Sequence, residues 1–214
     1  MRSGDNGETW SWPRTLLDGP IDDRDAGVFE TAKGSILVTT FTSLAYESRL
    51  HEERAKKESG AEDAWSDEHL ERWLAVERRI SPEQRRAELG QWMIRSTDGG
   101  VTWSARYAVP VNSPHGPIQL NDGRLLYAGK HLWTEGKECA VCESHDDGQT
   151  WQQLSRIPVR NGDVETNYHE LHAVECDSGK LIVQIRNHNE NNHRETLQCE
   201  SSDGGRTWSV PHSI

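Results

Sequence analysis

The sequence has no long apolar run, fewer basic than acidic residues and few cysteines. No stretch of about 18 apolar residues occurs, so the sequence predicts no membrane-spanning helix. The formal net charge of -11 argues against nucleic acid as a partner. The four cysteines show no convincing zinc or disulfide spacing (Cys139, Cys142, Cys176 and Cys199). We therefore expect no metal ion and no cofactor, and no partner that is recognised through a basic surface.

What the sequence does contain is one turn motif in four copies. The pattern Ser-x-Asp-x-Gly-x-Thr-Trp occurs as "SGDNGETW", "STDGGVTW", "SHDDGQTW" and "SSDGGRTW". We call these segments boxes 1 to 4 (residues 3–10, 96–103, 144–151 and 201–208). A structural unit is repeated in this way more often than a catalytic loop. A calcium loop of the EF-hand type would need more acidic positions and a distal glutamate, which the boxes lack.

Each residue type in a box suits a tight hairpin turn. The glycine can take the positive φ that such a turn demands. The aspartate and the Ser or Thr hydroxyl can bond to the backbone of the turn, and the tryptophan begins the next strand with a large apolar face. The boxes are therefore predicted to be structural, through Asp5, Trp10, Asp98, Trp103, Asp146, Trp151, Asp203 and Trp208.

A second pattern recurs between the boxes. The segments "DAGVFETAKGSILVTTF", "PHGPIQLNDGRLLYAGK" and "ELHAVECDSGKLIVQIR" align without gaps on Gly34, Gly123 and Gly179. Each segment predicts a strand, a short glycine turn and a second strand. A third strand then leads into the box, and a fourth follows its tryptophan. Four antiparallel strands per unit, with boxes 2, 3 and 4 spaced by 48 and 57 residues, are typical of β-propeller blades.

Boxes 1 and 2 are farther apart because the sequence between them turns charged and helical. The stretch "WSDEHLERWLAVERR" carries Leu70, Trp73 and Leu74 on one face, with Ser66 as an N-cap. The stretch "SPEQ" is a capping box with proline at the first helical position. We predict a helical insertion over residues 44–89. It could be a stabilising cap or a lid, and we prefer a lid because lids over binding sites exclude water.

Strand direction predicts which residues share one end of the propeller. In a blade with strands A to D, the boxes are C–D turns and occupy one end, which we call the box end. The starts of A strands, the ends of B strands and the helical insertion meet at the other, which we call the mouth end. The gapless register places equivalent residues at A-strand starts (Asp25, Pro114 and Glu170) and at B-strand ends (Phe41, Lys130 and Arg186). We expect two carboxylates and two cations to converge there on a ligand.

On these residues the chain resembles the sialidase (neuraminidase) superfamily of six-bladed propellers with Asp-box, or BNR, repeats. The stretch "NYHELHAVECDSGKLIVQIRN" resembles the family segment in which a glutamate opens an A strand and an arginine closes the next strand. The resemblance implies that Glu170 polarises a tyrosine nucleophile and that Arg186 is one of three arginines that bind the substrate carboxylate. The stretch "DDRDAG" resembles a second A strand of the family, which implies that Asp25 borders the pocket.

The chemistry of a sialic acid explains these residue types. Its carboxylate lies on the anomeric carbon, so a carboxylate nucleophile would be repelled, whereas a neutral tyrosine would not. An arginine fork matches a carboxylate bidentately and lysine cannot, so Lys130 ranks below Arg186. Further candidates for substrate binding near the mouth end are Arg24, His115 and His169. The stretch "HELH" is not a zincin motif, since residues three apart on a strand point to opposite faces.

The resemblance implies an all-β fold of about three and a half blades out of six, within residues 1–214, with the helical insertion in one blade. Met1 stands two residues before box 1, so we expect a fragment or a truncated reading frame. The implied function is an exo-glycosidase that acts on sialic acid or a related acidic sugar, secreted or periplasmic. The family's nucleophile, acid/base and remaining arginines would fall outside the chain, which predicts an inactive fragment that self-associates through open edges. The alternative is a non-catalytic Asp-box propeller that binds glycan or protein.

Overall fold

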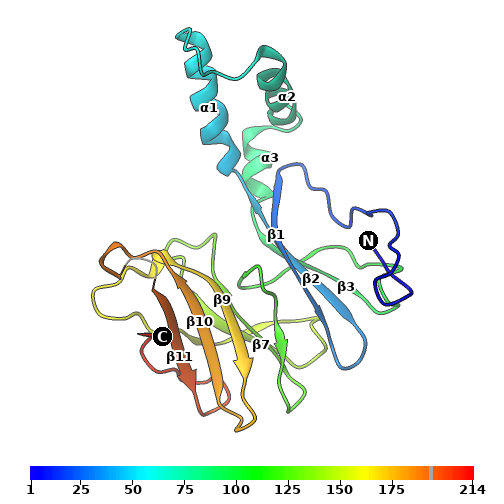
Figure 1. Cartoon of the computed structure of the whole chain (residues 1–214), viewed down its shortest axis with the longest axis vertical. Helices are drawn as coiled ribbons and strands as arrows, with labels where there is room; N and C mark the ends of the chain where they lie inside the picture. Colours follow the sequence, from blue (N-terminus) through cyan, green and yellow to red (C-terminus); the bar gives the residue numbers. More distant parts are fainter. Residues whose placement is uncertain (193–194) are drawn as a thin grey trace.

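The computed structural model describes residues 1–192 and 195–214 and consists mainly of antiparallel sheets (Figure 1). Its described residues form three four-stranded sheets, which we call blades 1 to 3, and strands pair in sequence order within each. Blade 1 contains β1 (Asp22–Glu30), β2 (Ile36–Ser43), β3 (Gln91–Ser96) and β4 (Tyr107–Ala108). Blade 2 contains β5 (Ile118–Gln119), β6 (Leu125–Lys130), β7 (Cys139–Ser144) and β8 (Gln152–Arg156). Blade 3 contains β9 (Tyr168–Glu175), β10 (Leu181–Asn187), β11 (Thr196–Ser201) and β12 (His212–Ser213).

The predicted all-β, propeller-type fold is confirmed, with its strand and turn order. The three aligned glycines lie in the turns between the first two strands of each blade, and all have positive φ (Gly34, Gly123 and Gly179). Boxes 2 to 4 follow the third strand of each blade. Residues 1–21 contain box 1 but no strand. Of the expected half blade, this segment therefore forms only the box turn.

The blades are held together by apolar contacts on both faces of blade 2. Successive residues of β6 are all buried, and side chains alternate between the two faces of a strand. Leu125 and Tyr127 pack toward Leu37 of blade 1. Leu126 packs toward Val183 of blade 3. Blade 2 therefore lies between its neighbours, with a core on each side.

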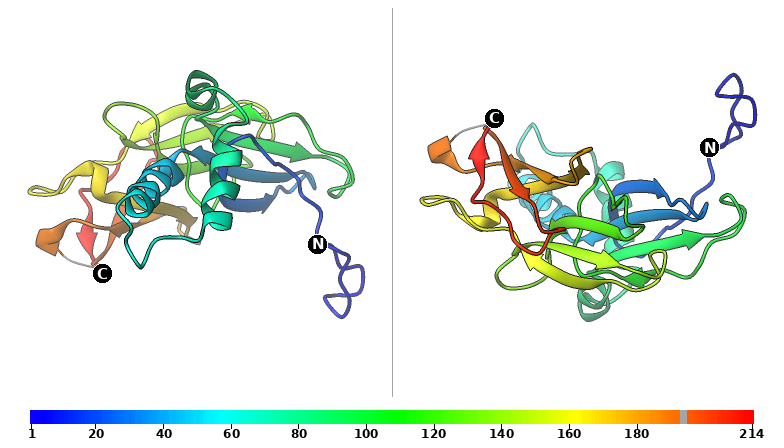
Figure 2. Two further views of the ribbon diagram at one scale, coloured as in Figure 1. Left: turned by 90° about the horizontal axis from the view of Figure 1, so that it is seen from above. Right: turned by 90° about the horizontal axis from the view of Figure 1, so that it is seen from below.

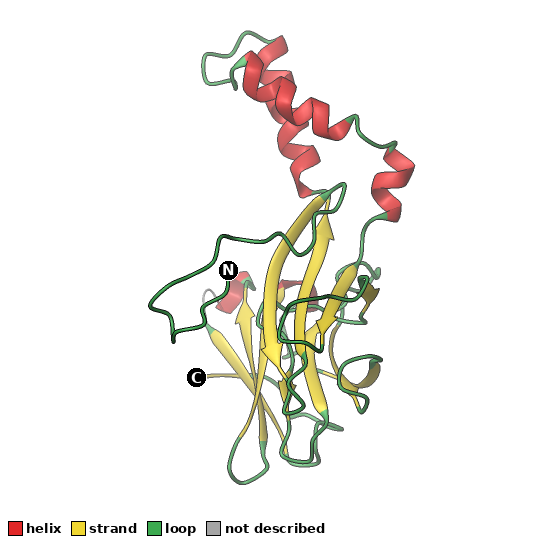
Figure 3. Ribbon diagram, turned by 90° about the vertical axis from the view of Figure 1, so that its right-hand side faces the viewer, coloured by secondary structure: helices red, strands yellow, loops and turns green. Residues whose placement is uncertain are grey.

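The helical insertion has a small core of its own. Between β2 and β3 the chain forms α1 (Ala45–Glu58), α2 (Asp67–Glu77) and α3 (Pro82–Ala87), at the end of the sheets away from the box turns (Figure 3). Leu50, Leu70 and Leu74 are buried together, with Trp65 and Trp73 packed against them. Seen from above, α1 and α2 overlap the outline of the sheets, and α3 lies at its edge (Figure 2). The insertion therefore stands over the mouth end.

The local signals of the insertion are confirmed, and they fix where its helices begin. The side chain of Ser66 accepts a hydrogen bond from the backbone N–H of His69, as an N-cap does. Ser81 and Gln84 form the reciprocal capping box before α3. Arg85 is buried and forms an ion pair with Glu47, which ties α3 to α1.

The four boxes share one hydrogen-bond pattern. In box 2, Ser96 Oγ donates to the Asp98 carboxylate (2.8 Å) and accepts from the N–H of Gly100 (2.9 Å). The same carboxylate accepts from the Oγ1 (2.6 Å) and the N–H (2.9 Å) of Thr102, and Trp103 Nε1 donates to the Gly100 carbonyl. These bonds recur in boxes 1, 3 and 4. Hydrogen bonds from Thr102 lower the pKa of Asp98 to about 2. The carboxylate of Asp98 therefore binds groups of its own turn.

Box 3 also fastens blade 2 to blade 1. Its second aspartate, Asp147, has a φ of 65°, and the other boxes have no aspartate at this position. The carboxylate accepts a hydrogen bond from Ser35 Oγ (2.6 Å) and forms an ion pair with Arg95, both in blade 1. Arg95 Nε also donates to the Asp147 carbonyl oxygen at 3.0 Å. In box 3, Asp146 therefore stabilises the turn, and Asp147 binds the neighbouring blade.

Replacing Asp147 with alanine is expected to lower the free energy of unfolding by about 1–3 kcal/mol, because Arg95 and Ser35 lose a buried acceptor. Asp177 is an exposed turn aspartate of blade 3, and its replacement with alanine is the matched control. Urea unfolding of the two variants measures the difference. Equal stability of the two variants would contradict the role of Asp147 as a fastener.

Candidate active site

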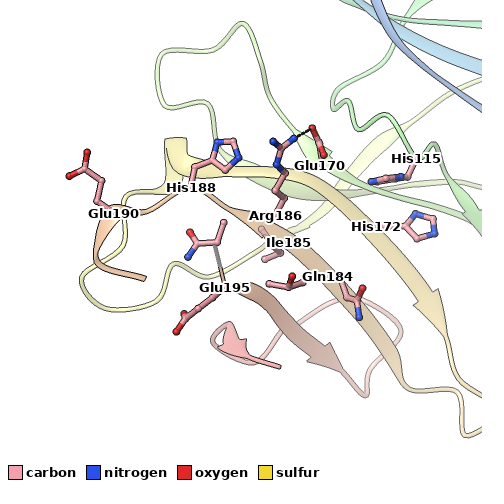
Figure 4. A pocket seen from close by; sticks show the side chains of 11 residues that line it. His115, Glu170, His172, Gln184, Ile185, Arg186, His188, Glu190 and Glu195 are labelled. Carbon is pink, nitrogen blue, oxygen red and sulfur yellow. Dashed lines mark hydrogen bonds and ion pairs between the residues drawn. The ribbon is translucent and has the colours of Figure 1, made fainter. Parts of the chain in front are cut away.

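A cleft of about 780 Å³ opens on blade 3 at the mouth end (Figure 4). It is lined by Glu170 and Arg186, which β9 and β10 contribute, and by His115 from the segment before β5. Further lining residues are His172, Gln184, Ile185, Asn187, His188, Glu190, Glu195 and Thr196. The cleft therefore joins a carboxylate, a guanidinium and several imidazoles.

A β-bulge sets the direction of Glu170. The register between β9 and β10 passes from His172 opposite Gln184 to His169 opposite Arg186, so β9 has one extra residue there. Bulges of this kind bend a strand and redirect a side chain. Glu170 has a φ of 46°, a region that residues other than glycine rarely adopt. Backbone strain of this kind is common at functional sites. The positive φ therefore strengthens the case for Glu170 that its position in the strand already makes.

Blade 1 repeats this bulge at the equivalent position. The register of β1 and β2 shifts between Arg24 and Gly27, and Asp25 has a φ of 50°. The gapless alignment of Asp25 with Glu170 therefore corresponds to a shared local backbone geometry. Two blades thus present a carboxylate from the same kind of bulge near the start of their innermost strands.

Arg186 and Glu170 form an ion pair across the first two strands of blade 3. Their side chains are 55% and 37% exposed, so solvent or a ligand can reach both. Only Nη1 of Arg186 bonds to Glu170, and its Nε and Nη2 have no hydrogen bond to another described residue. A guanidinium has five donors in a planar fork, so Arg186 retains the groups that bind a second carboxylate.

Two pairs of histidines flank this ion pair. His115 and His172 come from adjacent blades, and their ring centroids are 5.2 Å apart. His188 lies 4.6 Å from His169 by the same measure. Burial, together with the nearby cation of Lys130, lowers the pKa of His169 to about 4. His169 is therefore a neutral imidazole at neutral pH, able to donate or accept hydrogen bonds without adding charge.

Lys130 lies outside the Glu170–Arg186 cleft. Its side chain is buried, and its ammonium donates to the carbonyl oxygens of Thr166 (2.6 Å) and Tyr168 (3.0 Å). Together with His169 it lines a separate cleft of about 530 Å³. The ammonium therefore holds the segment before β9 in place instead of facing a ligand beside Arg186.

Asp25 and Arg24 line another cleft, of about 330 Å³, on blade 1. This cleft also includes Leu16 and Trp92. The convergence of two carboxylates and two cations at one mouth stays a prediction for the whole propeller, and in the described chain these side chains line three separate clefts. Of the predicted site residues, Glu170, Arg186 and His115 line one cleft, Asp25 and Arg24 line a second, and Lys130 and His169 line a third.

The sequence interpretation missed several lining residues. His172 lies two residues after Glu170, and strand alternation could have identified it as a neighbour on the same face. Glu190 belongs to the short helix η2 (Glu190–Asn192), and Glu195 follows it before β11. No periodic signal marks either glutamate, because irregular segments place their side chains through the path of the loop.

The findings on metal ligands, membrane spans and cysteines concern residues 1–192 and 195–214. In that part of the chain, no three His, Cys, Asp or Glu side chains gather as metal ligands would. None of its helices has the length and apolarity needed to cross a bilayer. Cys142 and Cys199 are buried in strands, and burial raises the pKa of each thiol to about 12.

Comparisons with known proteins place the chain in a family of repeat domains. The model of one protein family, described as a BNR repeat-like domain, matches residues 42–214. A xyloglucanase from Paenibacillus sp is 30% identical over 125 residues, which are 57% of this chain and 12% of that protein. The chain thus spans only a small part of the curated relative.

Solved structures share the fold. A protein of unknown function from Dyadobacter fermentans has a TM-score of 0.66 at 16% identity, over 97% of this chain and 56% of that one. A Hadza microbial sialidase has a TM-score of 0.62 at 20% identity, over 97% and 38%. An α-L-arabinofuranosidase from Fusarium graminearum has a TM-score of 0.54 at 17% identity, over 88% and 47%. At these identities the likeness shows a common fold, and the chain spans about half or less of each structure.

Proposed function

We propose, from the premise that this chain belongs to the family of BNR repeat-like domains, that its Glu170–Arg186 cleft binds the acidic end of a glycan. The sugar is sialic acid or a related acidic sugar. In the whole protein the cleft serves an exo-glycoside hydrolase of the sialidase type.

One observation carries this proposal: the partly exposed guanidinium of Arg186, with free donors, faces a cleft beside Glu170. A ligand carboxylate can take the unoccupied Nε and Nη2 of Arg186 in a bidentate pair. His115 and His172 line the same cleft and can bond to sugar hydroxyls. The arrangement suits a ligand that carries one carboxylate and several hydroxyls.

Glu170 has the place of a residue that polarises a nucleophile, yet no tyrosine hydroxyl in the described chain bonds to it. Tyr168 is a near neighbour in sequence, but it is buried and its hydroxyl donates to Asp163 at 2.7 Å. The hydroxyls of Tyr107 and Tyr127 bond to backbone carbonyls. We therefore propose that the nucleophile belongs to another part of the whole protein, and the family resemblance implies the same for the acid/base.

The absence of a tyrosine beside Glu170 within the described residues also favours a second candidate. A non-catalytic propeller would need only the binding half of this site. Both candidates predict that the chain binds an acidic sugar, and they differ in whether a longer polypeptide hydrolyses it.

The chain of 214 residues is expected to bind N-acetylneuraminic acid without hydrolysing a chromogenic sialoside. Calorimetry measures the binding, and release of the chromophore measures turnover, with a chromogenic galactoside as the control substrate. Robust turnover by this chain would show that the roles assigned to Glu170 and to the outside residues are wrong. Failure to bind the acidic sugar would refute both candidates.

A further inference from the structure

A further cleft, of about 440 Å³, lies between the helical insertion and the segment that leads into β1. One wall is residues 18–22, and the other is Tyr46 of α1 with Trp73 and Val76 of α2. The helices stand at the mouth end, away from the box turns (Figures 1 and 3). The cleft is therefore at the same end of the sheets as the Glu170–Arg186 cleft, but it is lined by different residues.

Two aromatic rings form a fixed apolar wall of this cleft. Tyr46 and Trp73 meet edge to face, with ring centroids 6.4 Å apart. Trp73 also packs against Trp65 at 4.8 Å, within the core of the insertion. These contacts hold Trp73 in one orientation while it lines the cleft. Apolar C–H faces of sugar rings pack well on such aromatic side chains, which combine a large apolar body with a polar tip.

The rim of the cleft carries both signs of charge. Arg72 and Arg79 line it beside Asp18 and Asp22. Arg79 is exposed and forms no ion pair with a described residue, so its donors are available. Planar donors and acceptors set around aromatic rings match a ligand rich in hydroxyl groups. Two carboxylates make the site unsuitable for a simple anion, and four charged groups make it unsuitable for an apolar ligand.

Tyr46, which lines this cleft, also carries a hydroxyl group. Its hydroxyl oxygen is buried and has no hydrogen-bond partner among the described residues. A cleft that served only to pack α1 and α2 against the sheet would not need four charged side chains around it.

We propose that this cleft is a second glycan-binding site, which takes a neutral sugar unit on Trp73 and Tyr46, with Arg79 as a hydrogen-bond donor. If the acidic end of a glycan binds at Arg186, the second site holds a more distant unit of the same glycan. This role of the second site rests on the proposed function. The helical insertion then serves substrate recognition in addition to covering the mouth end.

The test uses three neutral disaccharides, lactose, cellobiose and arabinobiose, titrated into the whole chain by calorimetry. We expect at least one to bind, and Trp73→Ala to weaken its binding by about tenfold or more. Arg79→Gln should weaken it several-fold, and since Arg79 is exposed and unpaired this variant tests the site without affecting folding. Trp12→Ala removes an exposed tryptophan elsewhere and should leave binding unchanged.

The outcomes separate this site from the proposed function. Arg186→Ala should abolish binding of N-acetylneuraminic acid and leave binding of the neutral disaccharide intact. Binding of a neutral disaccharide without binding of the acidic sugar would refute the proposed function and keep the second site. If none of the three disaccharides binds, or if Trp73→Ala and Arg79→Gln bind as tightly as the unmodified chain, the second site is refuted.

Discussion

Replacement of Trp208 with alanine is expected to lower the free energy of unfolding by about 3–5 kcal/mol. Trp208 of box 4 is only 8% exposed and belongs to the core that blades 2 and 3 share. Its Nε1 donates to the Gly205 carbonyl oxygen (3.1 Å) and to Ser155 Oγ of blade 2 (3.0 Å). Truncation would open a cavity between two blades and remove both hydrogen bonds.

Trp10 of box 1 is the matched control for this experiment. It makes the same bond to its own turn, from Nε1 to the Gly7 carbonyl oxygen, but it is 60% exposed. Trp10→Ala should therefore change stability by less than about 1 kcal/mol. Urea unfolding of both variants measures the difference. Equal losses would mean that the boxes stabilise their own turns and contribute little to the packing of blades.

Arg186→Ala is expected to weaken binding of N-acetylneuraminic acid by about 2–5 kcal/mol, measured by calorimetry. The variant removes the guanidinium that would pair with the sugar carboxylate. It also leaves Glu170 as an unpaired carboxylate in the same cleft, which repels the ligand. The two effects act in the same direction, so the loss should be large.

Glu170→Gln is the matched control, because it changes the other member of the same ion pair. It removes the negative charge, keeps the size of the side chain and releases Arg186 from its partner. Binding of the acidic sugar should be unchanged or tighter. If Glu170→Gln weakens binding as much as Arg186→Ala does, then the ion pair is needed for the shape of the cleft, and Arg186 is not the carboxylate receptor.

The repeat pattern predicted the blades well because the signals that set them are local. Glycine turns, alternating apolar residues and box residues act within a few positions of one another, so the alignment on Gly34, Gly123 and Gly179 also gives the strand order. The caps at Ser66 and Ser81 depend only on residues within one turn of helix. These features could be predicted from the sequence alone.

The composition of the cleft depends on longer-range geometry. Lys130 and Arg186 share a register position, yet the ammonium of Lys130 donates hydrogen bonds to two backbone carbonyls of the following segment and is buried. The bulge that redirects Glu170 requires a positive φ that a glutamate does not signal. Glu190 and Glu195 reach the cleft through a loop whose path no periodicity reveals. Shared register therefore predicted which end each residue occupies, but not which cleft it lines.

The most direct test of acidic-sugar binding at Arg186 is an NMR titration of the chain with N-acetylneuraminic acid, observed at the side-chain Nε–H groups of its arginines. We predict that the Arg186 signal shifts and saturates with the sugar. The signal of Arg124, whose guanidinium is paired with Asp122 and Glu143 between strands of blade 2, should stay in place. An Arg186 signal that does not move at saturating sugar would contradict the proposed site.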